Sequence, residues 1–193
     1  MRRYAVVGLG LCLGLAVVPA CEKDAATQPA AQPGEPAWGT PVNGLQAGLD
    51  FLGFFVGEFK AFAKLRFRLR NAGDKPVRVL RLSARAHYWG ENLPIEVKVG
   101  SEVLKYRGPV LEPPLPPGPE SYVYLAPGGI DSVDVEMNPA HWGAQDLSKA
   151  TAAFVFTNRN EKEDLGPRWP VITGLWIGTA RSVPISLVSG SAN

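Results

Sequence analysis

Residue types that commonly carry catalysis or bind metals are few in this chain. Its two histidines, His87 and His141, lie far apart in sequence. A two-histidine metal site requires the fold to bring them together, whereas a lone histidine is usually satisfied by ordinary hydrogen bonds. The chain has no G-x-S-x-G, S-x-x-K or H-E-x-x-H motif and no phosphate-binding glycine loop. We therefore expect a protein that is not an enzyme and holds no cofactor or metal. The alternative is an enzyme or metal-dependent protein that uses His87 or His141.

The first 21 residues combine a basic start, an apolar run and a cysteine. Two arginines at residues 2–3 precede residues 5–17, which are apolar or glycine except for one cysteine. This run is shorter than the about 20 residues that cross a bilayer as a helix, but it fits the apolar core of a secretory signal. Residues 18–21 then read Val-Pro-Ala-Cys. They resemble the lipobox of bacterial lipoproteins.

The lipobox resemblance implies a specific modification of Cys21. In that family a diacylglycerol alkylates the thiol, the signal peptide (here residues 1–20) is removed, and the new amino group is acylated. Two or more acyl chains hold a protein stably at a membrane. We therefore expect an exported protein anchored to a bacterial membrane through lipid on Cys21. Because Glu22 rather than aspartate follows, the resemblance favours an outer membrane, facing the periplasm. The alternative is an ordinary signal peptide cleaved after Ala20.

Processing at this site would change the thiol content and the charge of the chain. Cys12 would leave with the signal and Cys21 would carry lipid, so the mature chain would have no thiolate for catalysis or zinc. The full chain has 20 Lys+Arg and 18 Asp+Glu, and removing the two N-terminal arginines leaves 18 of each. This balance gives no reason to expect a nucleic-acid partner. Residues 21–37 have the composition of a disordered tether, which leaves residues 38–193 for one globular domain.

The most unusual charge pattern in the domain is a run of cations. Between residues 60 and 85 there are nine Lys/Arg and one acid, Asp74. Arginine suits phosphate because its planar fork binds two oxygens. An acidic neighbouring strand that carries Asp134 and Glu136, with Glu96 on another strand, is the simpler explanation. The candidates for binding an anionic partner are Lys64, Arg66, Arg68, Arg70, Arg81 and Arg85.

Aromatic and polar loops offer other contacts. Tryptophans at the ends of strands usually cap a core, but in an envelope protein they can also stack on sugars, and the glycan-contact candidates are Trp89, Trp142 and Trp169. Residues 158–164 form an oxygen-rich loop, either solvated or bound to calcium. Residues 111–120 are proline-rich and predict a stiff polyproline II connection. The expected partners besides the membrane are therefore an envelope protein, a glycan or an anionic lipid.

The elements that position these residues are predicted to be short strands. Residues 59–70 alternate strictly, with Ala63, Leu65, Phe67 and Leu69 on one face and the cations on the other. After a turn at residues 71–76, a second strand begins at Val77. Its inward residues change parity near Leu80, where we expect a bulge before the strand continues, so that Arg81, Arg85 and His87 point outward beside the first strand. Further strands are predicted at residues 95–99, 103–106, 121–125, 130–137, 151–157, 171–177 and 183–188.

The number and spacing of these strands predict an all-β, two-sheet sandwich of about seven to nine strands, with a closed barrel as the alternative. Residues 138–148 are predicted to hold a helical turn, with Pro139 just inside its start. Residues 69–77, 125–129 and 176–187 resemble turn and closing-strand motifs of secreted bacterial immunoglobulin-like domains. This resemblance implies an immunoglobulin-like sandwich but no activity, because such sandwiches host many functions. We therefore expect a non-catalytic binding or scaffold module.

Overall fold

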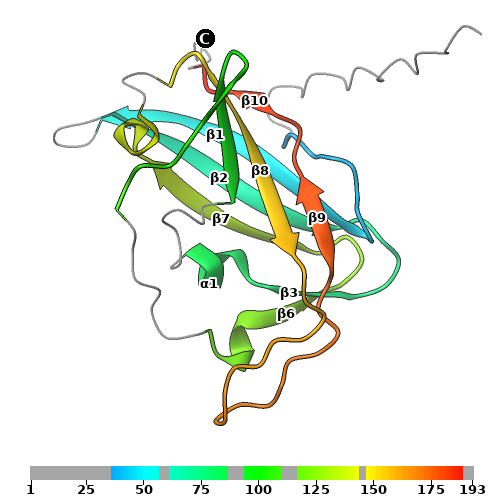
Figure 1. Ribbon diagram of the computed structural model, residues 1–193. Coiled ribbons are helices and arrows are strands. Elements are labelled where there is room, and N and C mark those ends of the chain that lie inside the picture. The colour runs from blue at the N-terminus through cyan, green and yellow to red at the C-terminus, as the bar shows by residue number, and fades with distance from the viewer. Residues whose placement is uncertain (1–35, 57–60, 87–93, 110–116, 144–146, 189–193) are drawn as a thin grey trace, which may run out of the picture.

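The computed structural model describes residues 36–56, 61–86, 94–109, 117–143 and 147–188 (Figure 1). The signal peptide, Cys21 and nearly all of the tether lie outside these residues. So do His87, Trp89 and most of the proline-rich segment. Among the described residues, no helix has the length and apolar character needed to cross a membrane.

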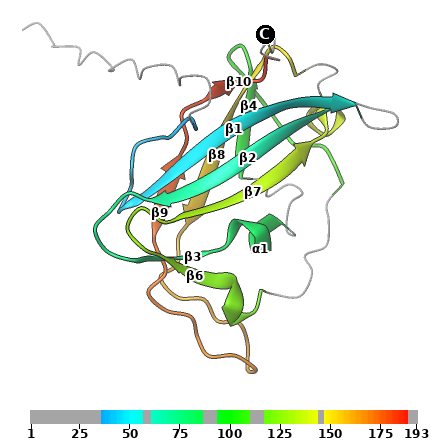
Figure 2. The same ribbon diagram turned by 180° about the vertical axis from the view of Figure 1, so that it is seen from behind.

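The protein is an all-β sandwich whose strands pair antiparallel. One sheet has the strand order β1-β2-β7, and the facing sheet has the order β10-β8-β4-β5, with β9 also paired to β8. Strands β3 and β6 form a small third sheet at one end of the molecule (Figures 1 and 2). The described residues form ten strands: β1 (Leu45–Val56), β2 (Ala61–Asn71), β3 (Val77–Leu80), β4 (Ile95–Val99), β5 (Glu102–Leu104), β6 (Tyr122–Leu125), β7 (Ile130–Met137), β8 (Ala150–Asn158), β9 (Gly178–Arg181) and β10 (Ile185–Ser186).

Strand β2 lies at the centre of its sheet and supplies the middle of the core. As its alternation predicts, Ala63, Leu65, Phe67 and Leu69 are fully buried. The ring of Phe67 stacks on that of Phe154 in β8, with a centroid distance of 4.7 Å and an interplanar angle of 6°. This contact joins the two sheets, so the inward face of β2 holds the sandwich together. The outward face of β2 is left to the cations.

The strand β1 was not predicted from the sequence. Its residues alternate like those of β2, but the pattern is interrupted by Gly48 and by a register shift between Phe51 and Gly53. Gly48 permits close packing, because a Cβ there would lie 2.6 Å from Cε3 of Trp38. The bulge at Leu52 changes the parity of the residues that follow. The period-two signal is therefore confined to residues 45–51, although the strand is 12 residues long.

The predicted continuation of the second strand beyond Leu80 is wrong. Strand β3 ends there, and Leu82–Ala86 form a short helix, α1. The backbone N–H of Leu82 donates to Oδ2 of Asp131 at 2.7 Å, and the Leu82 side chain is buried. A carboxylate at the first N–H groups of a helix satisfies donors that have no intrahelical partner. This interaction, together with burial of Leu82, turns the chain into α1 instead of a bulged strand.

The other predicted elements divide into confirmed strands and one error. The strands at residues 95–99 and 130–137 match β4 and β7, and four others overlap β5, β6, β8 and β10. The predicted helical turn is the 3-10 helix Pro139–Trp142, where the Asn138 side chain accepts from the N–H of Ala140. No strand occupies residues 171–177, which make only isolated bridges at Ile172 and Leu175. Ile172 and Leu175 are buried in a small separate apolar cluster and Trp176 in the main core, so the apolar pattern reflects burial of single loop residues.

Candidate functional site

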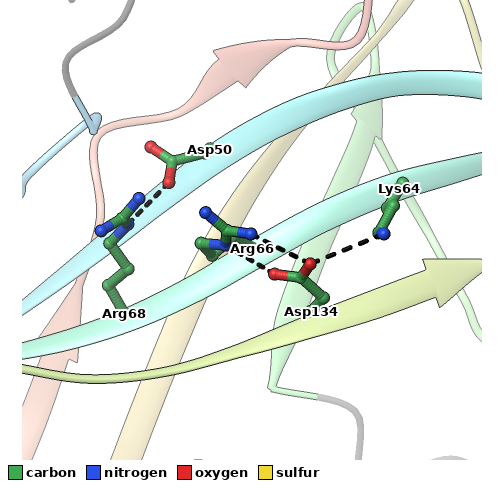
Figure 3. Close-up of polar contacts among 5 residues, drawn as sticks. All are labelled: Asp50, Lys64, Arg66, Arg68 and Asp134. Atoms are coloured by element: carbon green, nitrogen blue, oxygen red, sulfur yellow. Dashed lines mark hydrogen bonds and ion pairs between the residues drawn. The ribbon is translucent and has the colours of Figure 1, made fainter.

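The candidate site is the outward face of β2, where Lys64, Arg66, Arg68 and Arg70 form one line that we call the cation ridge. These side chains alternate with the buried residues of the strand, as predicted. Strand β1 flanks the ridge on one side and β7 on the other (Figure 3). Directly opposed residues of an antiparallel pair share a face. The net charge of this face therefore depends also on the residues that β1 and β7 place beside the ridge.

The β7 side supplies the acid that the sequence predicted. Asp134 lies opposite Arg66 and accepts from its Nε at 2.6 Å and from its Nη2 at 3.1 Å. Nζ of Lys64 lies 3.6 Å from Oδ2 of the same carboxylate. The hydrogen bond from Arg66, helped by the charges of Arg66 and Lys64, holds the pKa of Asp134 below its usual value. Asp134 is therefore an anion that fixes the Arg66 guanidinium in a bidentate geometry.

The β1 side supplies a second acid that sequence reasoning missed. Nε of Arg68 donates to Oδ2 of Asp50 at 2.7 Å. This pair is the less exposed one, with side-chain exposures of 26% for Arg68 and 16% for Asp50. Asp50 was missed because β1 itself was missed. The signal was nevertheless present, since residues 45–51 alternate between apolar and polar or glycine positions.

Arg70 differs from the other ridge cations because its partners are neutral. Its Nε and Nη2 donate to Oε1 of Gln46 at 3.0 and 2.5 Å. Its guanidinium also lies over the Trp38 ring, 4.4 Å from the centroid, in a cation–π contact. Gln46 is buried and is itself held by a hydrogen bond from its Nε2 to the carbonyl of Gly39. Within the described part of the chain, Arg70 is thus positioned by neutral partners and not by a carboxylate.

Two of the predicted anionic-partner residues do not join the ridge. Strand β3 pairs with β6, whereas β2 pairs with β1 and β7, so the expected neighbour relation is wrong. Arg81 is exposed between β3 and α1, and Arg85 belongs to α1. The turn after β2 leads the chain into a different sheet, so Arg81 and Arg85 do not lie beside the ridge.

Glu96 also belongs elsewhere, on the facing sheet. Its carboxylate accepts from Nη1 and Nη2 of Arg181 at 3.1 and 2.6 Å, and its Oε1 lies 2.9 Å from Nζ of Lys98. Hydrogen bonds from Arg181 and from Lys98 lower the pKa of Glu96 to about 2. Glu96 therefore stabilises the β4–β9 side of the sandwich and offsets none of the ridge charge.

Lowering the pH should reduce the free energy of unfolding, because Glu96 becomes protonated and loses its ion pairs. Its folded-state pKa is depressed from the ordinary 4.5 to about 2, so the stabilisation is complete above pH 4.5 and is lost as the pH falls towards 2. Because the group is partly solvated, we expect a loss of about 1 kcal/mol. Urea unfolding at pH 7 and pH 3 should show a smaller pH difference in Glu96→Gln than in the parent. Glu102→Gln, at an exposed position on β5, should retain the parental difference; an identical difference in all three proteins would contradict the assignment.

The other predicted contact residues are scattered. Trp142 is 5% exposed and packs in the core, which leaves little of its ring surface for a sugar, while Trp169 is 50% exposed in a loop. Nε2 of His141 lies 3.4 Å from Nδ2 of Asn138, and its ring meets the edge of Tyr106. In the oxygen-rich loop, Asn158 donates to the carbonyls of Asn160 and Trp176.

The placement of His, Cys, Asp and Glu side chains bears on metal binding. Within the described ranges, no group of three or more His, Cys, Asp or Glu side chains is arranged to hold a metal ion. His87 lies outside those ranges, so its placement relative to His141 is not described. Comparison of the chain with protein-family models and with curated protein sequences gives no match.

Proposed function

We propose that this protein is an exported, lipid-anchored and non-catalytic binding module of the bacterial envelope, and that its cation ridge contacts an anionic surface. The observation that carries the proposal is the alignment of four cations along the solvent face of one strand. The lipobox resemblance at Cys21 supports the anchoring. The order of strand and turn motifs supports an immunoglobulin-like version of the sandwich. The cations, not the neutral net charge of the mature chain, define the binding face.

The ridge suits an anionic surface because its cations are both ordered and accessible. Asp50, Asp134 and Gln46 fix three guanidinium groups, so an incoming phosphate would immobilise little additional side-chain freedom. Arg66 and Lys64 keep 37% and 43% of their side-chain surface exposed. The cations of the ridge outnumber the acids beside it, which are Asp50, Asp134 and Glu136. The face therefore retains positive charge despite its internal ion pairs.

Binding to anionic vesicles tests this proposal. A chain of residues 22–193 keeps the whole described core, which runs from Ala37 to Leu187. We expect it to bind vesicles containing anionic lipid, less tightly as salt rises, and to bind neutral vesicles weakly. Replacing Arg66 and Arg68 together by glutamine should weaken binding about tenfold or more, at about 1 kcal/mol for each cation. Sedimentation with vesicles over a salt series measures the effect.

Two further variants make the vesicle test specific to the ridge. Asp50→Asn with Asp134→Asn removes the competing acids and should strengthen binding. Lys98→Gln with Arg181→Gln removes the same charge as the ridge double variant, but from the facing sheet, and should leave binding near the parental level. Equal binding to neutral and anionic vesicles, or equal losses in the two cation variants, would refute a contact through the ridge.

A further inference from the structure

The acids beside the cation ridge are confined to one of its halves. Asp50 and Asp134 both lie directly opposite Arg66 in the strand register. Glu136 lies directly opposite Lys64. Figure 3 shows Asp50 and Asp134 reaching the ridge from its two sides. In this half, three cross-strand acids face two cations, so the positive charge of Lys64 and Arg66 is fully offset.

The other half of the ridge, Arg68 and Arg70, is opposed by neutral residues alone. The residues directly opposite these two arginines are Gly48 and Gln46 on β1 and Ser132 and Ile130 on β7. Among the described residues, the carboxylate in contact with this half is that of Asp50, which accepts from Arg68. Arg70 contacts none. The positive charge that the ridge retains is therefore concentrated at the Arg68–Arg70 half.

Both arginines keep hydrogen-bond donors for a ligand. Arg68 donates through Nε to Asp50, and within the described ranges its two Nη groups have no partner. Arg70 donates through Nε and Nη2 to Gln46, which leaves its Nη1 group. Ser132 is exposed beside Arg68 and adds a hydroxyl. A guanidinium that is already fixed through one edge presents its remaining N–H groups to an oxyanion in a set orientation.

Apolar side chains border this half on both sides. On the β1 side, the Trp38 ring fills the space above Gly48, and the Arg70 guanidinium lies 4.4 Å from the ring centroid. On the β7 side, Ile130 lies directly opposite Arg70 and is 50% exposed. Apolar neighbours lower the local dielectric and strengthen attraction between charges. Tryptophan is also favoured at the interface between lipid and water. Arginine donors between apolar side chains suit the phosphate layer of a lipid surface.

The proposed lipid anchor allows a site of modest strength to be occupied. A cation near an anionic surface favours contact about fivefold, so two cations favour it about 25-fold. A protein tethered through Cys21 meets its own membrane in an intramolecular step, at an effective concentration on the order of millimolar. A soluble ligand would need a tighter site. The charge and the tether together favour lipid phosphate as the occupant.

We propose that the Arg68–Arg70 half of the ridge binds the phosphate groups of anionic phospholipid in the membrane to which the protein is anchored. The inference rests on the proposed anchor and ridge contact, and it adds which cations bind. Arg68 and Arg70 meet the phosphates, whereas Lys64 and Arg66 serve mainly to neutralise acids within the sheet face. Repulsion from lipid phosphate keeps the acidic half away from the membrane. The acids concerned are Asp50, Asp134 and Glu136.

A thiol placed inside the site tests its occupancy. In the lipidated protein Ser132→Cys creates the only free thiol, because Cys12 is removed and Cys21 is alkylated. A membrane-impermeant maleimide should react with it about tenfold more slowly on vesicles containing phosphatidylglycerol than on vesicles of phosphatidylcholine alone. Raising the salt concentration should abolish this protection. Thr151→Cys, exposed on the facing sheet, is the matched control and should react equally on both kinds of vesicle.

Two pairs of cation variants with the same change in charge locate the contact. In the Ser132→Cys protein, Arg68→Gln with Arg70→Gln should weaken docking about 25-fold and reduce the protection to about twofold or less. Lys64→Gln with Arg66→Gln removes the same charge from the same strand and should leave the protection at about fivefold or more.

A third pair of variants leaves the ridge arginines intact. Ile130→Glu places an acid opposite Arg70 and should also remove the protection, whereas Val103→Glu adds the same charge at an equally exposed position (50%) on β5 and should preserve it.

The outcomes separate the anchor, the ridge contact and the site. Failure of the parent protein to float with vesicles, or reaction of the parent with maleimide, would overturn the anchor and the inference that rests on it. Flotation with equal reaction rates of Ser132→Cys on the two kinds of vesicle would overturn the site and leave the anchor standing. Equal losses in the two pairs of cation variants would retain a contact through the ridge but overturn its assignment to Arg68 and Arg70. Protection on neutral vesicles by added alginate that equals protection by anionic lipid would identify an acidic polysaccharide as the occupant and would overturn the assignment to lipid.

Discussion

Replacing Phe67 by alanine should lower the free energy of unfolding by about 3–5 kcal/mol, the range for deletion of a buried aromatic ring. Phe67 is fully buried on the central strand of its sheet and stacks on Phe154 of the facing sheet. The substitution would open a cavity between two sheets whose backbones are held by strand pairing on both sides of β2. Such a site relaxes little, so the loss should lie in the upper half of the range. Urea unfolding followed by tryptophan fluorescence measures it.

Phe62→Ala is the matched control for this prediction. It removes the same side chain from the same strand, but from the outward face and from a pair with Phe55 that lies outside the core. A cross-strand pair of this kind contributes about 1 kcal/mol or less. Losses of similar size in Phe67→Ala and Phe62→Ala would mean that the two faces of β2 are not buried as described. A large loss for Phe67 alone would establish that the inward face carries the stability, which leaves the outward face available for binding.

The difference between these two faces is the part of the fold that the sequence predicts best. Strict alternation identified β2, its buried residues and its cations, because a half-buried strand is a local pattern. β1 was not predicted because its alternation covers only residues 45–51 and includes a glycine, and the bulge at Leu52 reverses the parity of the residues that follow. The continuation past Leu80 failed for a different reason. Asp131, which turns the chain into α1, is 49 residues away and has no local signal.

The candidate site was predicted to the same extent as the strands that build it. The pairing of the ridge with Asp134 was correct because β7 was correctly bounded and alternates in charge. Asp50 and Gln46 were missed together with β1, and Arg81, Arg85 and Glu96 were misplaced because sequence order does not determine which strands are neighbours. The strand register determines which charged residues face each other, and the register depends on contacts between residues far apart in sequence. The surface that results is less basic than the sequence suggests, because most of its cations already have acidic or polar partners.

Asn71 gives the second large expected effect, because it is a fully buried polar residue at a junction of two turns. Its Nδ2 donates to the carbonyls of Lys75 and Leu125 at 2.7 and 2.8 Å, and its Oδ1 accepts from the N–H of Gly73 at 3.0 Å. The side chain therefore closes the turn after β2 and ties it to the end of β6. Asn71→Ala would leave buried backbone groups without partners, and we expect a loss of about 2–4 kcal/mol in the free energy of unfolding.

Two comparisons distinguish this hydrogen-bonding role from a packing role. Asn71→Asp preserves the shape and the acceptor for Gly73, but it directs a charge at two carbonyl oxygens. It should therefore destabilise at least as much as alanine near pH 7 and recover part of the loss when the carboxylate is protonated at low pH. Asn160→Ala removes an exposed asparagine and should change stability by about 0.5 kcal/mol or less. An aspartate variant as stable as the parent at pH 7 would show that packing, not donation to the Lys75 and Leu125 carbonyls, holds this junction. The acceptor role of Oδ1 should appear separately, as slow amide exchange at Gly73 in the parent and fast exchange in Asn71→Ala, because the lost acceptor exposes that N–H to solvent.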